Sequence, residues 1–166
     1  VLFRSTALNQ TDSQQENPNL VYVCDPVLGD DGKLYVPDEL VDIYRTEILG
    51  VATMLTPNQF ECEILVGRSI HSLSDAIASC IWLHDQGPDI VVITSMVLPA
   101  DPEHILVLAS QRGSFESGES MEISCGQGGA STPPAMFCLK VPRIDGNFTG
   151  TGDLTAALLL AWHSKH

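Results

Sequence analysis

The chain contains 166 residues, with 21 acidic and 8 basic side chains and a formal net charge of -13. This length suits a single domain with its own hydrophobic core, and an apolar content of 44% argues against general disorder. Because Lys and Arg are scarce, an extended phosphate-binding surface is excluded, and we expect no nucleic-acid partner. An anion would have to be held locally by backbone N–H groups, a helix N-terminus or a bound cation.

In chain order, the sequence predicts strands alternating with helices. Continuous runs of β-branched residues indicate buried strands, and Pro or Ser before an apolar repeat with Gly after it indicates a helix. We expect a strand over 20–24, a helix over 37–49, a strand over 51–56, helices over 57–67 and 72–87, strands over 89–95, 104–111, 121–125 and 137–141, and a core helix over 154–162.

This alternation predicts an α/β layer fold with a mostly parallel sheet. In such sheets, ligands bind beyond the carboxyl ends of the strands. Polar residues that follow predicted strands could therefore share one edge and form a site: Asp25, Asn58, Glu61, Thr94 and Asp153.

The cysteines give no sign of a disulfide framework or a zinc site. The five of them are widely spaced and include no C-x-x-C pair, which favours reduced thiols in a cytoplasmic protein. The longest apolar run, Leu154 to Trp162, is too short to cross a bilayer, so we expect no membrane partner.

The first residues differ in character from the rest of the chain. Val1–Ser5 match the translation of the tail of a common sequencing adapter, and residues 6–18 are rich in the polar residues typical of a linker. We therefore expect 1–18 to be an adapter scar and a flexible lead-in, and 19–166 to be the folded part.

The segment GTGD, Gly150 to Asp153, precedes the apolar run. It would place the N–H groups of Gly150, Thr151 and Gly152 at a helix N-terminus, where a partial charge of roughly +0.5 faces an approaching anion. Asp153 could then remove a proton from an alcohol while these amides stabilise the group being transferred. The alternative is that Asp153 only complements the dipole of its own helix.

The segment TPNQFE, Thr56 to Glu61, is a second candidate. It places Asn58 and Glu61 on one face of a short helix, where they suit a hydrated Mg²⁺ and the phosphates it carries. The alternative is an ordinary helix start with a favourably placed acid. The chain contains no Walker sequence, so it is not a P-loop kinase.

A series of motifs, CDPVLGD, LYVP, TPNQFE, GPDIVVITS, VLASQR and GTGDLTAALLLAW, resembles the pyridoxal kinases of the ribokinase-like superfamily over 19–165. NPNLVYVCDPVLGD together with TPNQFE is more similar to pyridoxal kinases than to hydroxymethylpyrimidine kinases. The resemblance implies a ribokinase-like three-layer α/β/α fold with a mostly parallel central sheet, truncated at both ends. It also implies ATP-dependent phosphorylation of the 5′-hydroxyl of pyridoxal, pyridoxine or pyridoxamine in pyridoxal 5′-phosphate salvage.

The resemblance further implies a role for each matching residue. Asp153 corresponds to the catalytic base, and Gly150, Thr151 and Gly152 correspond to the anion hole. Tyr35, Gly150 and Asp153 would contact the vitamin. A divalent cation, Mg²⁺, would lie near Asp30 and Glu61. A monovalent cation, K⁺ or Na⁺, would be held by Asp25, Thr56 and Thr94. ATP would be bound by Asp25, Asn58, Glu61, Thr94, Ser95, Ile144, Asp145, Gly146 and Thr151.

Family members are commonly homodimers, so we expect the full-length protein to be one. The resemblance also indicates that an N-terminal portion, which carries much of the vitamin-binding surface, is missing from this chain. Two alternatives therefore stay open: another small-alcohol kinase of the superfamily, such as a hydroxymethylpyrimidine kinase, and a non-catalytic nucleotide-binding fragment.

Overall fold

The structure is a computed structural model that describes residues 20–113, 134–144, 146 and 150–165. Within these ranges, every strand and helix expected from the sequence is present. The expectations for 1–18, for the strand over 121–125 and for Asp145 lie outside the described residues. The strands are β1 Val23–Cys24, β2 Gly29–Asp30, β3 Lys33–Leu34, β4 Met54–Leu55, β5 Ile90–Met96, β6 His104–Gln111 and β7 Ala135–Pro142. The helices are α2 Asp38–Ile43, a π turn Tyr44–Ile48 and a 3-10 turn Leu49–Val51 that continue it, α3 Gln59–Val66, α4 Leu73–Gln86 and α5 Thr151–His163.

Five strands form one mixed sheet in the order β1-β4-β5-β6-β7. β1, β4 and β5 are parallel, whereas β6 is antiparallel to β5 and β7 is antiparallel to β6. The sheet is therefore mixed rather than mostly parallel in its pairings, and β6 runs opposite to the other four strands of this sheet. The connection from Val97 to Glu103 explains why, because it is too short for the crossover that a parallel return requires.

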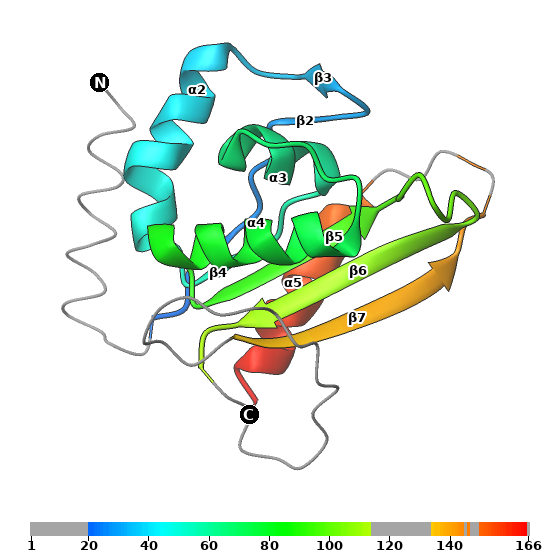
Figure 1. The fold of residues 1–166 in the computed structure, drawn as a ribbon. Coiled ribbons are helices and arrows are strands. Elements are labelled where there is room, and N and C mark those ends of the chain that lie inside the picture. Colours follow the sequence, from blue (N-terminus) through cyan, green and yellow to red (C-terminus); the bar gives the residue numbers. More distant parts are fainter. Residues whose placement is uncertain (1–19, 114–133, 145, 147–149, 166) are drawn as a thin grey trace.

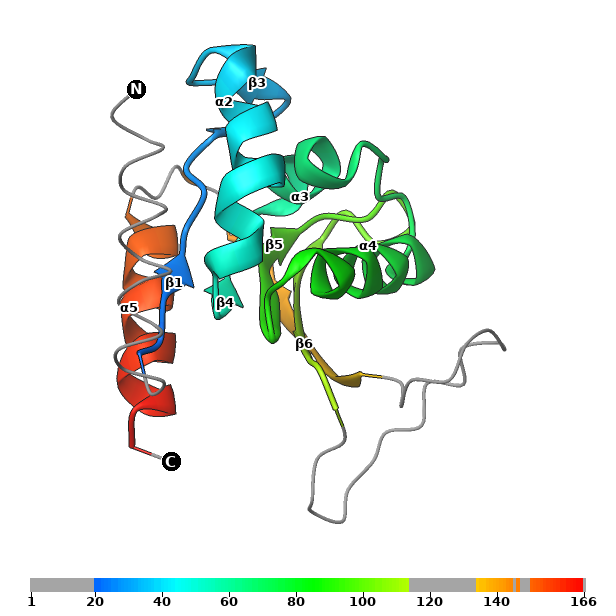
Figure 2. The same cartoon turned by 90° about the vertical axis from the view of Figure 1, so that its left-hand side faces the viewer.

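Helices cover both faces of this sheet (Figure 1). α3 and α4 lie on one face and α5 lies on the other, as the turned view shows most clearly (Figure 2). α3 begins with a capping box, in which the Asn58 side chain accepts from the Glu61 N–H, and ends, as predicted, at Gly67 in the left-handed conformation. α4 begins at Ser72, whose side chain accepts from the Asp75 N–H.

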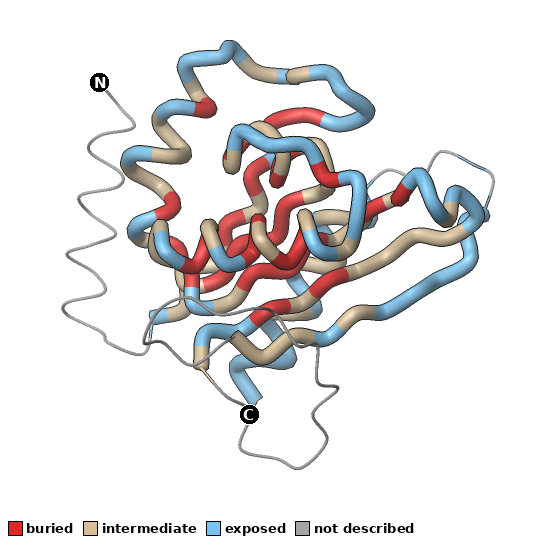
Figure 3. Tube along the Cα trace, viewed as in Figure 1, coloured by how far each residue is buried: buried red, intermediate tan, exposed pale blue. Residues whose placement is uncertain are grey.

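The buried core lies where β4 and β5 meet α3 and α4 (Figure 3). Leu55, Leu65, Leu83 and Ile93 are fully buried there. α5 differs, because none of its residues is buried and Leu154 and Leu158 are each 60% exposed. The helix forms where it was predicted, but its prediction as a core helix is wrong. Apolar periodicity specifies a helix without specifying what packs against it.

A small hairpin, β2 and β3, was not predicted from the sequence. Its turn, Asp31–Gly32, has positive φ angles of 48° and 74°, and Asp-Gly is a strong signal for this kind of turn. Gly29 in β2 must be glycine, because a Cβ atom there would overlap the Lys33 carbonyl and the Phe60 ring. The absence of a side chain at Gly29 lets the hairpin pack closely against Phe60 at the start of α3.

The described cysteines Cys24, Cys62, Cys80 and Cys138 are all free thiols. Burial raises the pKa of Cys24 and of Cys80 to about 12, so both remain protonated and unreactive at neutral pH. Among the helices of the described residues, none has the length and apolarity needed to cross a membrane.

Candidate functional site

Three parallel strands end at one edge of the sheet and bring their polar residues together. Asp25 follows β1, Thr56 follows β4, and Thr94 lies near the end of β5. The Thr56 N–H donates to the Cys24 carbonyl at 3.0 Å, and the Thr94 N–H donates to the Pro57 carbonyl at 2.9 Å. These bonds fix the three segments relative to one another. The edge therefore presents a carboxylate and two hydroxyl groups in one region.

The first turn of α3 fastens the loop that follows β1. Glu61 is only 4% exposed; its Oε1 accepts from the Leu28 N–H at 2.8 Å and its Oε2 accepts from the Asn58 N–H at 2.9 Å. The Asn58 Nδ2 donates to the Gly29 carbonyl at 2.8 Å. Burial raises the pKa of Glu61, whereas these N–H groups oppose that rise by favouring the carboxylate. Asn58 and Glu61 thus hold the turn that carries Asp30.

The N-terminus of α5 lies beside the end of β1. Gly150 begins the helix with a φ of 79°, and no described side chain caps its first N–H groups. A Cβ atom on Gly152 would lie 3.7 Å from Asp25 Oδ2. The pKa of the Asp25 carboxyl is raised, first by burial and then by the negative charge of Asp153. The structure therefore brings Asp153 and the N-terminal amides of Thr151 and Gly152 to the strand edge.

The other predicted residues lie farther out. Asp30 is exposed and its Oδ1 accepts from the Asp31 N–H at 2.9 Å. Tyr35 follows the hairpin, donates its backbone N–H to the Leu28 carbonyl at 2.9 Å and is 65% exposed. Ser95 is half-buried next to Thr94, and Ile144 is 71% exposed. Within the described ranges, neither Ile144 nor Gly146 makes a hydrogen bond to the strand-end residues.

The acidic residues at this edge suit a magnesium ion that is shared with phosphates. In the part of the chain that the structure describes, no three His, Cys, Asp or Glu side chains gather as a metal-binding cluster. Mg²⁺ does not need such a cluster, because it is usually held by one or two carboxylates together with waters and substrate phosphates. Asp30, on the turn that Asn58 and Glu61 hold, could supply such a carboxylate.

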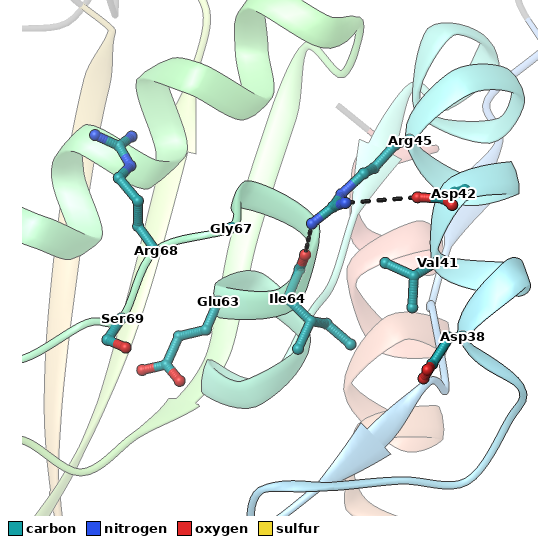
Figure 4. A pocket seen from close by; sticks show the side chains of 9 residues that line it. All are labelled: Asp38, Val41, Asp42, Arg45, Glu63, Ile64, Gly67, Arg68 and Ser69. Carbon is teal, nitrogen blue, oxygen red and sulfur yellow. Dashed lines mark hydrogen bonds and ion pairs between the residues drawn. The ribbon is translucent and has the colours of Figure 1, made fainter.

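A separate groove of about 510 Å³ lies between α2 and the C-terminal end of α3, and it is lined by none of the predicted site residues (Figure 4). Its Arg45 donates to the carbonyl oxygens of Ile64 and Leu65 and pairs with Asp42 at 3.6 Å. Arg45 therefore stabilises the end of α3. We place the candidate site at the strand ends, where the uncapped helix and the clustered polar groups meet.

Sequence reasoning missed the contribution of the backbone around Leu28 and of Gln59. The Asp-Gly turn could have revealed the hairpin, and with it the need to fasten the Leu28–Gly29 segment. Gln59 lies inside the TPNQFE motif but was given no role. Its side-chain oxygen accepts from the Val97 N–H at 3.0 Å.

Asp25→Asn is expected to stabilise the protein at neutral pH when no small cation is present. Because the folded-state pKa of Asp25 is raised, the stability that comes from its protonation is fully present below the unfolded pKa of about 3.9 and is lost as pH rises through the folded pKa. The greater stability of Asp25→Asn over the unaltered protein should therefore disappear in acid. Thermal unfolding of both proteins in tetramethylammonium buffers, from below the unfolded pKa of about 3.9 up to neutral pH, measures this difference in stability.

Glu103→Gln is the matched control for Asp25→Asn, because Glu103 is an exposed carboxylate in the turn before β6. Its amide should show no such pH-dependent advantage. If Asp25→Asn and Glu103→Gln had the same pH profile, burial and the charge of Asp153 could not be what raises the pKa of Asp25.

Comparison with known proteins identifies the family. The whole chain, residues 1–166, matches the family model described as phosphomethylpyrimidine kinase. Pyridoxal kinase of Sus scrofa is 44% identical over 159 residues, which cover 92% of this chain and 46% of the relative. Pyridoxal kinase of Arabidopsis thaliana is 46% identical over 150 residues, covering 90% of this chain and 43% of the relative.

Solved structures give the same result. Pyridoxal kinase from Leishmania donovani in complex with ADP and pyridoxamine is 34% identical with a TM-score of 0.81, covering 99% of this chain and 53% of that one. The chain thus spans about half the length of the relatives it matches. It belongs to the phosphomethylpyrimidine kinase family, and within that family it resembles the pyridoxal kinases over nearly all of its length.

Proposed function

We propose that the full-length protein containing this chain is an ATP-dependent kinase that phosphorylates the 5′-hydroxyl of pyridoxal, pyridoxine or pyridoxamine in pyridoxal 5′-phosphate salvage. The observation that carries the proposal is the approach of α5 to Asp25, since Asp25 Oδ2 lies 3.7 Å from the Cβ position of Gly152. This approach puts the Asp153 carboxylate and the uncapped amides at the same strand edge as Thr56 and Thr94.

In this proposal Asp153 accepts the proton of the 5′-hydroxyl as that oxygen attacks the γ-phosphorus of ATP and ADP leaves. The N–H groups of Gly150, Thr151 and Gly152 stabilise the negative charge of the phosphoryl group in flight. The amides at a helix N-terminus suit this task, because they point at the anion and carry partial positive charge. Tyr35, next to the hairpin, covers the vitamin.

The nucleotide lies along the strand edge in this proposal. Mg²⁺ would be held near Asp30, with Glu61 and Asn58 ordering the turn around it, and it would neutralise phosphate charge. Asp25, Thr56 and Thr94 would hold a monovalent cation, K⁺ or Na⁺. These cations suit an acidic chain, since clustered Lys and Arg are scarce in it. The nucleotide contacts would come from Thr94, Ser95, Ile144, Asp145, Gly146 and Thr151.

Solved structures of similar proteins support this assignment. The Leishmania donovani enzyme is described with ADP and pyridoxamine, and the Plasmodium falciparum protein with AMP-PNP and PL. The proposal includes the finer features that the resemblance implies: a ribokinase-like three-layer fold that extends beyond this chain at both ends, a homodimer, and a cytoplasmic location.

A second candidate is a hydroxymethylpyrimidine kinase, which the description of the matching family model favours. A coupled assay of ADP release by the full-length protein separates the two. We expect turnover with pyridoxal, pyridoxine or pyridoxamine and little with hydroxymethylpyrimidine. The reverse preference would support the second candidate, and nucleotide binding without any turnover would support a non-catalytic protein.

A further inference from the structure

The side chain of Gln59 joins three segments of the chain. Its Oε1 accepts from the Val97 N–H at 3.0 Å, and its Nε2 donates to the Ile70 carbonyl at 3.0 Å and to Glu63 Oε1 at 3.2 Å. The amide therefore uses its acceptor oxygen and its donor group at once. Gln59 is half-buried at the start of α3, and Ile70 is fully buried. These contacts connect α3, the loop before α4 and the segment after β5.

The segment bound by Gln59 follows an irregularity in β5. Ile93 pairs with Leu108, but Met96 pairs with Leu106, so β5 contains one more residue than β6 across this interval. The extra residue makes a bulge, and bulges re-aim side chains next to functional sites. Thr94 and Ser95 occupy this bulge.

The bulge is held at both ends by residues at or just before the start of α3. On one side the Pro57 carbonyl accepts from the Thr94 N–H at 2.9 Å and from Thr94 Oγ1 at 3.4 Å. On the other side Gln59 accepts from the Val97 N–H. If the Gln59 oxygen were removed, the Val97 N–H would lose its acceptor on α3. Thr94 would then be held only by its bonds to the Pro57 carbonyl.

We propose that Gln59 is a positioning residue for nucleotide binding, because it fixes the bulge that presents Thr94 and Ser95. This inference rests on the proposed function, in which these two residues contact ATP. Gln59 itself does not touch the nucleotide. It acts through Val97, while Asn58 beside it holds the Gly29 turn. Two consecutive residues, the N-cap and the first residue of α3, thus position the two loops on either side of the site.

Gln59→Met in the full-length protein tests the inference, because Met has a similar length and no hydrogen-bonding amide. We expect KM for ATP and the Kd for a non-hydrolysable ATP analogue to rise about tenfold, the effect of one lost hydrogen bond. KM for pyridoxal should change by less than about twofold, since the bulge does not face the vitamin in this proposal.

Gln86→Met is the matched control. Gln86 is also half-buried on a helix, but its amide donates only to the Trp82 carbonyl one turn back, at 3.4 Å. Both variants could lower the unfolding temperature, but only Gln59→Met should weaken nucleotide binding. If Gln59→Met altered stability but left the nucleotide Kd of the folded protein unchanged, the inference would be overturned.

Thr94→Ala in the same assay separates this inference from the proposed function. Weaker nucleotide binding in both Thr94→Ala and Gln59→Met supports both claims. Weaker binding in Thr94→Ala alone overturns the role of Gln59 and leaves the nucleotide site in place. If neither variant weakened binding, the nucleotide site at β5 would be wrong, and the inference would fail with it.

Discussion

Asp153→Asn in the full-length protein is expected to lower kcat for pyridoxal phosphorylation by about 10²–10⁴, the usual contribution of a positioned base. The amide has nearly the shape of the carboxylate but cannot accept the proton of the hydroxyl. Nucleotide binding should persist, because the Thr94 and Thr151 contacts proposed for ATP remain. Steady-state kinetics gives kcat, and calorimetry with an ATP analogue gives the affinity.

Asp85→Asn is the control for this change, because Asp85 is an exposed carboxylate on α4, on the opposite face of the sheet from α5. Its turnover should match that of the unaltered protein. Near-normal turnover by Asp153→Asn would reject Asp153 as the base and would leave the alternative in which it only complements the dipole of α5.

Glu61→Ala is expected to lower the free energy of unfolding by about 3 kcal/mol, because buried N–H groups left without an acceptor cost about 1–3 kcal/mol each. The groups that lose their best acceptor are the N–H of Leu28 and the N–H of Asn58. The same change releases the turn that carries Asp30, so the Mg²⁺ concentration needed for half-maximal activity should rise. Chemical denaturation and magnesium titration measure the two effects.

Glu103→Ala removes an exposed carboxylate and should leave both quantities nearly unchanged. A loss of activity in Glu61→Ala with no loss of stability would contradict a turn-holding role. It would instead favour direct contact between Glu61 and the ion.

The helices around the site could be predicted closely, because residues close in the sequence determine where each helix begins and ends. Local hydrogen bonds begin α3 at Asn58 and Glu61 and begin α4 at Ser72. A left-handed turn at Gly67 ends α3. The meeting of Asp25 with the start of α5 also followed from a general rule, since strand ends and helix starts share one edge of a parallel sheet. The roles of these residues stay predictions.

Other features depend on tertiary contacts that periodicity does not encode. The sequence predicted Glu61 in the first turn of a short helix, but not that its carboxylate reaches the Leu28 N–H across 33 positions of sequence. The short Val97–Glu103 connection does indicate the antiparallel direction of β6, because a parallel return needs a longer crossover. The exposure of Leu154 and Leu158 could not be read from their spacing, which specifies an apolar helix regardless of what lies against it.

The most direct test is a crystal structure of the full-length protein with pyridoxal, magnesium and a non-hydrolysable ATP analogue. The account predicts a carboxylate oxygen of Asp153 about 2.6–3.2 Å from the 5′-hydroxyl, with the γ-phosphate at the N-terminus of α5. A structure in which Asp153 points away from the vitamin, or in which the phosphates lie far from the ends of β1, β4 and β5, would contradict it.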